Sequence, residues 1–259
     1  MRETGLEEAI RAAGGVGALA RLVGISQPSI SNWSRIPAER VLAIEVATGV
    51  DRSVLRPDLY GERAVRAGDI DEVDAARAQE YTLLAMLLSR APDQALLDRL
   101  ATLRGDPTPL GVAHAALSEA ASRTSEERVE REYFNIFIGI GRGELLPYGS
   151  YYLTGFLHER PLARLRDHLM QLGIERAENQ PEPEDHAAIL CEVMAGLIGG
   201  RFAAAPGADR DFYERHLAPW IGRFFADLEQ AEAADLYSKA GTLGRVFMEI
   251  ETEAFALPS

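Results

Sequence analysis

The stretch LLPYGSYYLTG at residues 145–155 combines proline, glycine, serine and three tyrosines, a composition compatible with three kinds of site. A phosphate-binding loop would follow a strand and, in one common form, would carry a lysine before a serine or threonine. Here a helical pattern precedes the stretch and no such lysine is present. A nucleophile turn of the form G-x-S-x-G would need its second glycine where Tyr152 stands. The tyrosines offer amphipathic rings, so two interpretations stay open: a structural loop with core tyrosines, or a surface that binds a peptide.

A second stretch, PEPEDHAAILCEVM at residues 181–194, places two carboxylates and a histidine directly after prolines. The prolines predict an extended segment, after which Glu184 and Asp185 are expected in the first turn of a helix, where the helix dipole favours carboxylates. His186 is harder to explain, because the same dipole disfavours a protonated imidazole. We predict no metal site, because the remaining histidines form no pair on one helix face; they stand at positions 114, 158, 168 and 216.

The single cysteine and the lack of catalytic groupings disfavour an enzyme. Cys191 lies in the apolar run AILCEVMAGLI, where a thiol usually serves as a small hydrophobic group. No nucleophile and neighbouring base can be assembled from the candidate residues. We therefore expect neither catalysis nor a cofactor.

The charge of the chain is distributed unevenly. Over all 259 residues the formal net charge is -13, yet residues 1–64 hold eight arginines and eight acidic residues, so the whole deficit belongs to residues 65–259. An acidic body of this kind repels nucleic acid and membrane surfaces and favours a basic peptide as partner. No run of eighteen apolar residues and no secretory signal is found, so we expect a cytoplasmic protein that does not associate with membranes.

Hydrophobic periodicity predicts an all-α fold in two domains. Apolar residues recur three and four positions apart through most of the chain, for example at Leu84 and Leu87, and alternating strand patterns are nearly absent. The polar, acidic stretch GERAVRAGDIDEVDA suits a linker or a helix start better than a core element. We therefore expect a small domain over residues 1–60, a linker over 61–75 and a larger helical domain over 76–259.

The small domain carries the pattern of a helix-turn-helix in GALARLVGISQPSISNW. Gly24 permits a turn between two short helices, Ser26 is placed to cap the second helix, and Ile30 is expected in the core. Polar side chains remain on the outward side, where glutamine and asparagine can pair with adenine edges and arginine with guanine or phosphate. The candidate DNA-binding residues are Gln27, Ser29, Ser31, Asn32 and Arg35.

Over residues 5–60 the sequence resembles the Cro and YdaS-like family of antitoxin or repressor helix-turn-helix domains, and the similarity continues through IPAERVLAIEVATGVDRSVLRPDLY. One departure is the connector after Trp33, where only Ser34 and Arg35 precede Ile36, whereas relatives usually have a longer basic segment. The neutral charge also offers little counterion release to drive DNA binding. Two interpretations follow: a DNA-binding domain, or a helical module that has kept its core and contacts protein.

Two motifs of the larger domain, EYFNIFIGIGRGELLPYGSYYLTG and EPEDHAAILCEVM, resemble the TorD and DmsD family of redox-enzyme maturation chaperones. The resemblance extends from about residue 76 to the C-terminal end and includes HLAPWIGRFFADLE. It implies an all-helical cytoplasmic protein that binds the twin-arginine signal peptide of a molybdoenzyme subunit and holds the apoenzyme while the molybdenum cofactor is inserted. Carried over position by position, the family's binding residues fall on Pro147, Tyr148, Ser150, Tyr151, Glu184, Asp185 and His186.

The chemistry of such a peptide agrees with the resemblance. A twin-arginine peptide brings two guanidinium groups followed by an apolar stretch, so its receptor needs carboxylates beside an aromatic, apolar groove. The expected client is a formate dehydrogenase or a DMSO reductase-type enzyme. Two functions stay open: a peptide-binding chaperone with an appended DNA-binding module, and a transcription regulator whose chaperone-like domain senses unexported redox enzyme. A homodimer is expected where DNA is bound, because paired half-sites multiply modest affinities.

Overall fold

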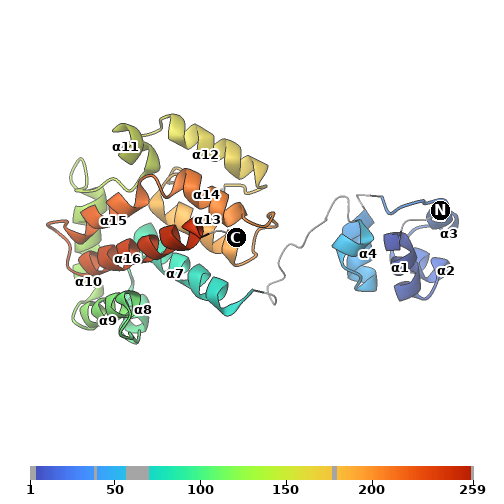
Figure 1. Ribbon diagram of the computed structural model, residues 1–259, viewed down its shortest axis with the longest axis horizontal. Coiled ribbons are helices and arrows are strands. Elements are labelled where there is room, and N and C mark those ends of the chain that lie inside the picture. Colours follow the sequence, from blue (N-terminus) through green and yellow to red (C-terminus); the bar gives the residue numbers. More distant parts are fainter. Residues whose placement is uncertain (1–3, 38–39, 57–69, 177–179, 258–259) are drawn as a thin grey trace. The chain divides into compact units, whose positions relative to one another are not determined.

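The structure, a computed structural model, describes residues 4–37, 40–56, 70–176 and 180–257. The chain divides into two compact units, residues 1–66 and 67–259 (Figure 1). Every regular element in the described ranges is helical, and the strand-like feature there is an isolated β-bridge between Tyr148 and His186. The predicted all-α class is therefore confirmed. Among the described helices, none has both the length and the apolar composition that a membrane span requires.

The described part of the small unit contains the helix-turn-helix that its sequence predicts. Gly24 adopts a φ of 68°, a left-handed conformation that glycine tolerates without strain, and so turns the chain after the first helix of the pair. Ser26 caps the second helix by accepting a hydrogen bond from the backbone N–H of Ser29 at 3.4 Å. Ile30 is fully buried. The helices are α1 (Thr4–Ala13), α2 (Val16–Leu22), α3 (Gln27–Ser31), α4 (Val41–Thr48) and α5 (Arg52–Leu55).

The large unit is a helical body around one hydrophobic core. Its helix α7 packs mainly along α13, while α16 packs along α15 and α9. The core is rich in aromatic rings, including Tyr81, Phe224 and Phe247. The described elements are α7 (Glu72–Ser89), α8 (Gln94–Leu100), α9 (Pro109–Ser122), α10 (Glu126–Tyr133), the π-helix η2 (Phe134–Ile138), α11 (Gly149–Thr154), α12 (Arg160–Gln171), α13 (Ala187–Ile198), α14 (Ala208–His216), α15 (Ile221–Glu229) and α16 (Leu236–Ala256).

A glycine allows α15 and α16 to approach closely. A Cβ atom added at Gly244 would lie 2.3 Å from the ring of Phe225, well inside van der Waals contact. The ring therefore packs directly on the backbone of α16. A larger residue at position 244 would push the two helices apart in a core that has little free volume.

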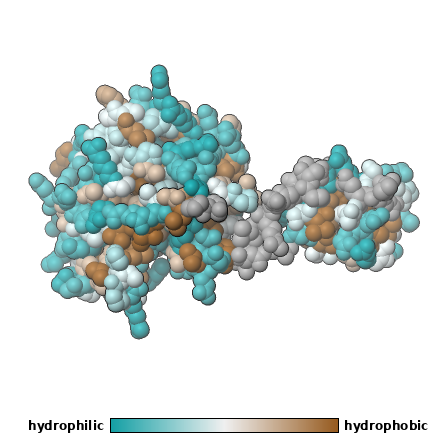
Figure 2. Space-filling model, viewed as in Figure 1, coloured by the Kyte–Doolittle hydropathy of each residue, from teal (hydrophilic) through white to brown (hydrophobic). Residues whose placement is uncertain are grey.

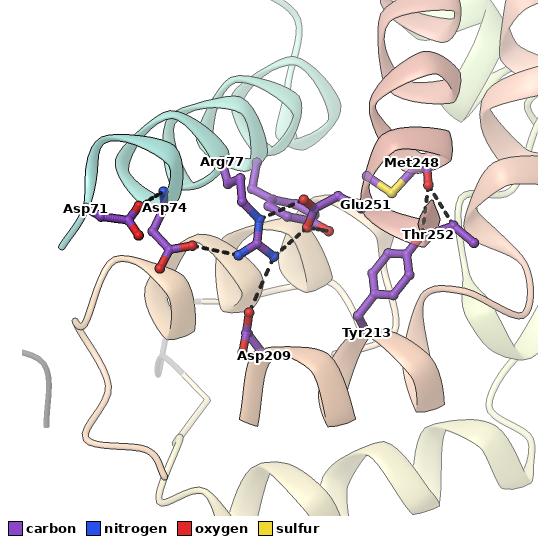
Figure 3. A network of polar contacts seen from close by, with 9 residues as sticks. Asp71, Asp74, Arg77, Asp209, Tyr213, Met248, Glu251 and Thr252 are labelled. Atoms are coloured by element: carbon purple, nitrogen blue, oxygen red, sulfur yellow. Dashed lines mark hydrogen bonds and ion pairs between the residues drawn. The ribbon is translucent and has the colours of Figure 1, made fainter. Parts of the chain in front are cut away.

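An ion-pair network joins the first and last helices of the large unit (Figure 3). The guanidinium of Arg77 donates to both carboxylate oxygens of Glu251, with distances of 2.7 and 2.8 Å. It also donates to Asp74 at 2.7 Å and to Asp209 at 3.4 Å. Glu251 is almost completely buried, so its charge depends on this bidentate partner.

The start of α7 differs from the linker predicted over residues 61–75. Residues 61–69 lie outside the described part of the chain, whereas residues 72–75 form the first turn of α7. The side chain of Asp71 caps this helix by accepting from the N–H of Asp74 at 2.8 Å. Of the two interpretations of this acidic stretch, a linker or a helix start, the second holds for residues 71–75, where the helix dipole favours carboxylates.

Candidate functional site

The bridge between Tyr148 and His186 brings together the tyrosine-rich loop and the acidic motif, which lie far apart in the sequence. The pairing is antiparallel, and it holds both segments extended where they cross. This pairing of the two backbone segments, which we call the junction, brings together four of the predicted site residues: Pro147, Tyr148, Asp185 and His186. Its two flanking hydrogen bonds run from the N–H of Gly149 to the carbonyl of Asp185 (2.9 Å) and from the N–H of Ala187 to that of Pro147 (2.8 Å).

Asp185 is buried inside this junction. Its Oδ2 atom accepts a hydrogen bond from the backbone N–H of Ser150 at 2.7 Å, and its side chain thereby satisfies a donor in the first turn of α11. Within the described residues, neither Asp185 Oδ1 nor the buried Ser150 hydroxyl oxygen has a hydrogen-bond partner. Asp185 and Ser150, two of the candidate peptide-binding residues, therefore meet in an internal contact of the fold.

His186 caps α13, which corrects the expectation that Glu184 and Asp185 occupy the first turn of this helix. The helix begins at Ala187, and the Nδ1 atom of His186 accepts a hydrogen bond from the N–H of Ala188 at 3.1 Å. This contact requires a neutral imidazole, and burial lowers the pKa of His186 to about 4. The helix dipole therefore does not conflict with the histidine, because the ring carries no charge at neutral pH.

Glu184 lies one residue outside the junction and is held by arginines. Arg166 on α12 donates to the same oxygen of Glu184 from two nitrogens, at 3.0 and 2.8 Å, and a nitrogen of Arg176 lies 4.0 Å from the other oxygen. Burial alone would raise the pKa of Glu184, but the hydrogen bonds from Arg166 lower it below its usual value. Glu184 is consequently ionised and already paired.

Glu182 is a further candidate residue, which the sequence pattern did not single out. Its Oε2 atom accepts a hydrogen bond from the Tyr148 hydroxyl at 2.6 Å, and the ring of Tyr148 packs edge-on against His186 at 5.1 Å. Burial and the adjacent carboxylate raise the pKa of Tyr148, so its hydroxyl remains a donor. Glu182 precedes Pro183 in the same motif as Glu184, and this alternation was the signal that could have identified it.

Tyr151 does not join the other predicted residues. Its hydroxyl accepts a hydrogen bond from Arg142 at 2.5 Å, and the same guanidinium lies 5.2 Å from the centre of the ring. The two residues line a cavity of about 380 Å³ together with Tyr152 and Asp227, and neither Tyr148 nor the acidic motif lines that cavity. Tyr151 therefore belongs to a different part of the surface.

An apolar cavity of about 360 Å³ adjoins the acidic motif. Arg166, Arg176 and Glu184 form a polar part of its wall, and the first two also line a neighbouring pocket of about 320 Å³ that contains Tyr148 and Glu182. The two hollows thus share a boundary of charged side chains. The apolar lining of the larger one comes from Leu169, Met170, Ile174, Ile189, Val193 and Phe202.

A third cavity, of about 460 Å³, lies on another side of Asp185 and contains a histidine pair. His168 Nδ1 and His216 Nε2 are 2.8 Å apart, so one ring must donate a proton that the other accepts. Burial lowers the pKa of both rings, that of His216 to about 4. The pair therefore adds no positive charge at neutral pH.

The described residues hold no group of three or more histidine, cysteine, aspartate or glutamate side chains that could bind a metal. Cys191 is fully buried, and burial raises the pKa of its thiol to about 12. The thiol is therefore protonated and enclosed, as expected for a small hydrophobic core residue.

In the small unit, the predicted DNA-binding residues are exposed on α3 or directly after it. Ser29 is partly engaged in capping, because its hydroxyl lies 2.7 Å from that of Ser26. Asn32 is the C-terminal cap residue of α3. The exposed residues are Gln27, Ser29, Ser31, Asn32 and Arg35.

Comparison with protein families gives one match in each unit. Residues 103–226 match the family described as nitrate reductase delta subunit, and residues 6–64 match the family described as bacterial toxin YdaS. The first match contains the tyrosine-rich loop and the acidic motif. The second contains α2 to α5 and most of α1.

Curated relatives and a solved structure each resemble part of this chain. The chaperone protein TorD of Vibrio cholerae serotype O1 is 27% identical over 195 residues, which cover 70% of this chain and 82% of the relative. DmsD of Haemophilus influenzae, described as a Tat proofreading chaperone, is 27% identical over 132 residues, covering 50% and 63%. A crystal structure from Archaeoglobus fulgidus, described as a redox enzyme maturation protein, covers 67% of this chain and 93% of its own at 19% identity, with a TM-score of 0.47.

Proposed function

We propose that this protein, whose large unit belongs to the TorD family of redox-enzyme maturation chaperones, binds the twin-arginine signal peptide of a molybdoenzyme precursor in the cytoplasm and holds that precursor during cofactor insertion. The relatives described as TorD and as a Tat proofreading chaperone support this class of function. Formate dehydrogenase and DMSO reductase-type enzymes remain the proposed clients.

The observation that best supports this proposal is that a pocket containing the carboxylate of Glu182 adjoins an apolar cavity. Glu182 faces the pocket, and the cavity beyond it has an apolar wall formed by α12, α13 and the segment after each helix. In a peptide whose arginines precede an apolar stretch, the arginines would bind in the pocket and the apolar side chains would bind in the cavity. Arginine would supply oriented hydrogen bonds at the pocket, and burial of the apolar stretch would supply most of the affinity.

Glu182 is the better acceptor for an incoming guanidinium than Glu184. Among the described residues, Glu182 has no ion-pair partner within 4.0 Å, whereas Glu184 is already bound by Arg166. A carboxylate that accepts from one hydroxyl retains lone pairs for a bidentate arginine contact. The repulsion from Arg166 is reduced because Glu184 neutralises it.

Isothermal titration calorimetry tests the proposal with a synthetic twin-arginine signal peptide and a variant in which two lysines replace the arginines. We expect micromolar or tighter binding of the first peptide and at least tenfold weaker binding of the second, because lysine cannot form the planar bidentate contact. Equal affinities would remove arginine recognition from the proposal. Absence of binding by either peptide would remove the signal peptide as ligand.

A second candidate function, DNA binding by the small unit, is favoured by the exposed polar face of α3 and by the match to the YdaS family. In that case the protein is a regulator whose large unit senses unexported enzyme. Fluorescence anisotropy with the upstream region of its own operon is the test. Asn32→Ala should weaken binding to the preferred sequence about fivefold, because asparagine pairs with adenine edges.

Arg35→Ala serves as the comparison variant in that DNA experiment. It should weaken binding to all sequences alike and reduce the dependence of affinity on salt, as expected for a phosphate contact. If the natural protein binds no DNA even at low salt, the small unit is a protein-contact module.

A further inference from the structure

Arg166 stands between the two hollows of the proposed peptide site. Its side chain lines both the pocket that contains Glu182 and the apolar cavity that contains Glu184. Arg176 lines both hollows as well. A continuous peptide that extends from the pocket into the cavity must therefore pass these two guanidinium groups, and its binding depends on whether either of them can move.

Arg176 is fixed to the backbone beside the pocket. Its Nη2 atom lies within hydrogen-bonding distance of three successive backbone carbonyl oxygens, those of Gln180 (2.5 Å), Pro181 (3.4 Å) and Glu182 (3.3 Å). Its Nη1 atom lies 4.0 Å from Glu184. Movement of Arg176 would therefore leave several backbone acceptors without this donor.

Arg166 is held by Glu184 alone. Its Nε and Nη2 atoms donate to Oε2 of Glu184 at 3.0 and 2.8 Å, and its side chain has no second ion-pair or hydrogen-bond partner in the described ranges. The side chain of Arg166 is 50% exposed, whereas that of Glu184 is only 12% exposed. The arginine can therefore turn out into water while the carboxylate stays in the wall of the cavity.

We propose that Arg166 occupies the binding position of the peptide's second arginine, and that peptide binding exchanges one guanidinium for the other on Glu184. This inference rests on the proposed function. The first arginine binds Glu182, which needs no exchange, and the second replaces Arg166 at the boundary with the cavity. The order from Glu182 to Glu184 to the apolar wall then matches the order of the peptide: arginine, arginine, apolar stretch.

The exchange conserves the ion pair, so its driving force comes from elsewhere. Burial of the peptide's apolar side chains in the cavity supplies free energy, and the release of Arg166 clears their path. The first arginine, once bound, also keeps the second at a high effective concentration near Glu184. The surface of the large unit in Figure 2 is mainly hydrophilic, with apolar side chains in separate patches, so a released guanidinium remains hydrated.

The exchange has a cost that can be measured. Peptide must wait for molecules in which Glu184 is free, and the apparent affinity is reduced by the fraction of such molecules. Arg166 therefore weakens the binding of the ligand whose place it holds. A residue that only formed part of the cavity wall would have the opposite effect, because its removal would take contacts away from the peptide.

Calorimetry with the twin-arginine peptide tests this competition. Arg166→Gln should bind the peptide about fivefold more tightly than the natural protein, because Glu184 is then always free. Arg164→Gln is the matched control. It removes the same charge from an exposed position two residues earlier on α12, where the side chain lines a different cavity, and it should change the affinity less than twofold. An unchanged or lower affinity of Arg166→Gln, or equal gains in both variants, would overturn the proposal.

Nuclear magnetic resonance observes the release itself. In protein labelled with nitrogen-15, the Nε–H signal of Arg166 can be assigned by its absence in Arg166→Lys. On saturation with unlabelled twin-arginine peptide, this signal should move to the position of solvent-exposed arginines such as Arg164, and its hydrogen exchange with water should become faster. A signal that keeps its original position and exchange rate at saturation would overturn the proposal.

Failure of this inference can be told apart from failure of the proposed function. If the natural protein binds the twin-arginine peptide and its lysine variant equally, the proposed function fails and the exchange at Glu184 fails with it. If the natural protein prefers arginine but Arg166 stays on Glu184 in the complex, the exchange alone is overturned. Glu182 would then carry the recognition of arginine without Glu184.

Discussion

The segment at residues 182–186 contains two pairs of ionisable side chains with opposite surroundings. Asp185 and His186 are buried and accept hydrogen bonds from backbone N–H groups. Glu182 and Glu184 are half-buried and are bonded to other side chains; Glu182 lines the pocket of about 320 Å³ and Glu184 the apolar cavity of about 360 Å³. Within this short motif, Asp185 and His186 therefore hold the motif to the tyrosine-rich loop, whereas Glu182 and Glu184 are the pair that a ligand can reach.

This division has an energetic basis. A buried acceptor that satisfies a backbone donor cannot be removed without leaving that donor unpaired, whereas a half-exposed carboxylate can be replaced because water takes its place. Changes in the buried pair should therefore alter folding stability, and changes in the accessible pair should alter ligand binding. Three substitutions separate these outcomes.

The largest effect is expected for Asp185→Ala. Removal of the carboxylate leaves the Ser150 N–H unpaired in the junction, and we expect a loss of about 3 kcal/mol in the free energy of unfolding of the large unit. Urea unfolding followed by Trp220 fluorescence measures this loss, in a Trp33→Phe background so that the signal reports on the large unit. A loss below about 0.5 kcal/mol would show that Asp185 does not support the fold.

The next effect concerns pH and His186. The folded-state pKa of His186 is about 4, below the value near 6.5 of an unfolded chain, so between these values the unfolded state binds more protons. Stability is therefore fully present above about pH 6.5 and falls as the pH decreases toward 4, with His216 acting in the same direction.

His186→Asn isolates the contribution of this residue, because asparagine can cap the helix but does not titrate. The slope of unfolding free energy against pH between pH 4.5 and 6 should decrease by about 1 kcal/mol per pH unit relative to the natural protein. Peptide affinity at pH 7.5 should change little. An unchanged slope would show that His186 is accessible to protons in the folded state.

The smallest effect is expected for Glu182→Gln, and it should appear in binding alone. We expect about tenfold weaker binding of the twin-arginine peptide, equivalent to about 1.4 kcal/mol, with a change in unfolding free energy below about 0.5 kcal/mol. Glu127→Gln on α10 provides a control with the same change in net charge at an exposed position. Equal losses of affinity in both variants would mean that overall charge, and not a contact at Glu182, attracts the peptide.

The helical elements could be predicted well because their signals are local. Gly24 and Ser26 defined the turn and the cap of the helix-turn-helix in the small unit. Capping and hydrophobic periodicity depend on residues within a few positions of one another. The sequence therefore contains these signals in full.

The site was less predictable because its geometry depends on pairing between distant segments. Residues 184 and 185 form a turn that the His186 N–H closes on the Pro183 carbonyl, and His186 then bridges to Tyr148 before α13 begins; no local pattern indicates this bridge. Tyr151 was grouped with Tyr148, but Tyr148 lies in the extended bridge and Tyr151 lies in α11, so their side chains diverge. Glu182 lies at the start of the motif EPEDHAAILCEVM, but the family resemblance assigned binding roles only to the Glu-Asp-His run at 184–186.

The contact between Arg77 and Glu251 also sets an order of events during synthesis of the chain. These residues are 174 positions apart, so α7 cannot complete its ion pair until nearly the whole chain has been made. At roughly 5–20 residues per second, this interval is roughly 10–35 s. The core of the small unit is complete once Leu55 has been added. During synthesis there is therefore a period in which the small unit can fold and bind partners while the large unit cannot yet form the ion pair between α7 and α16.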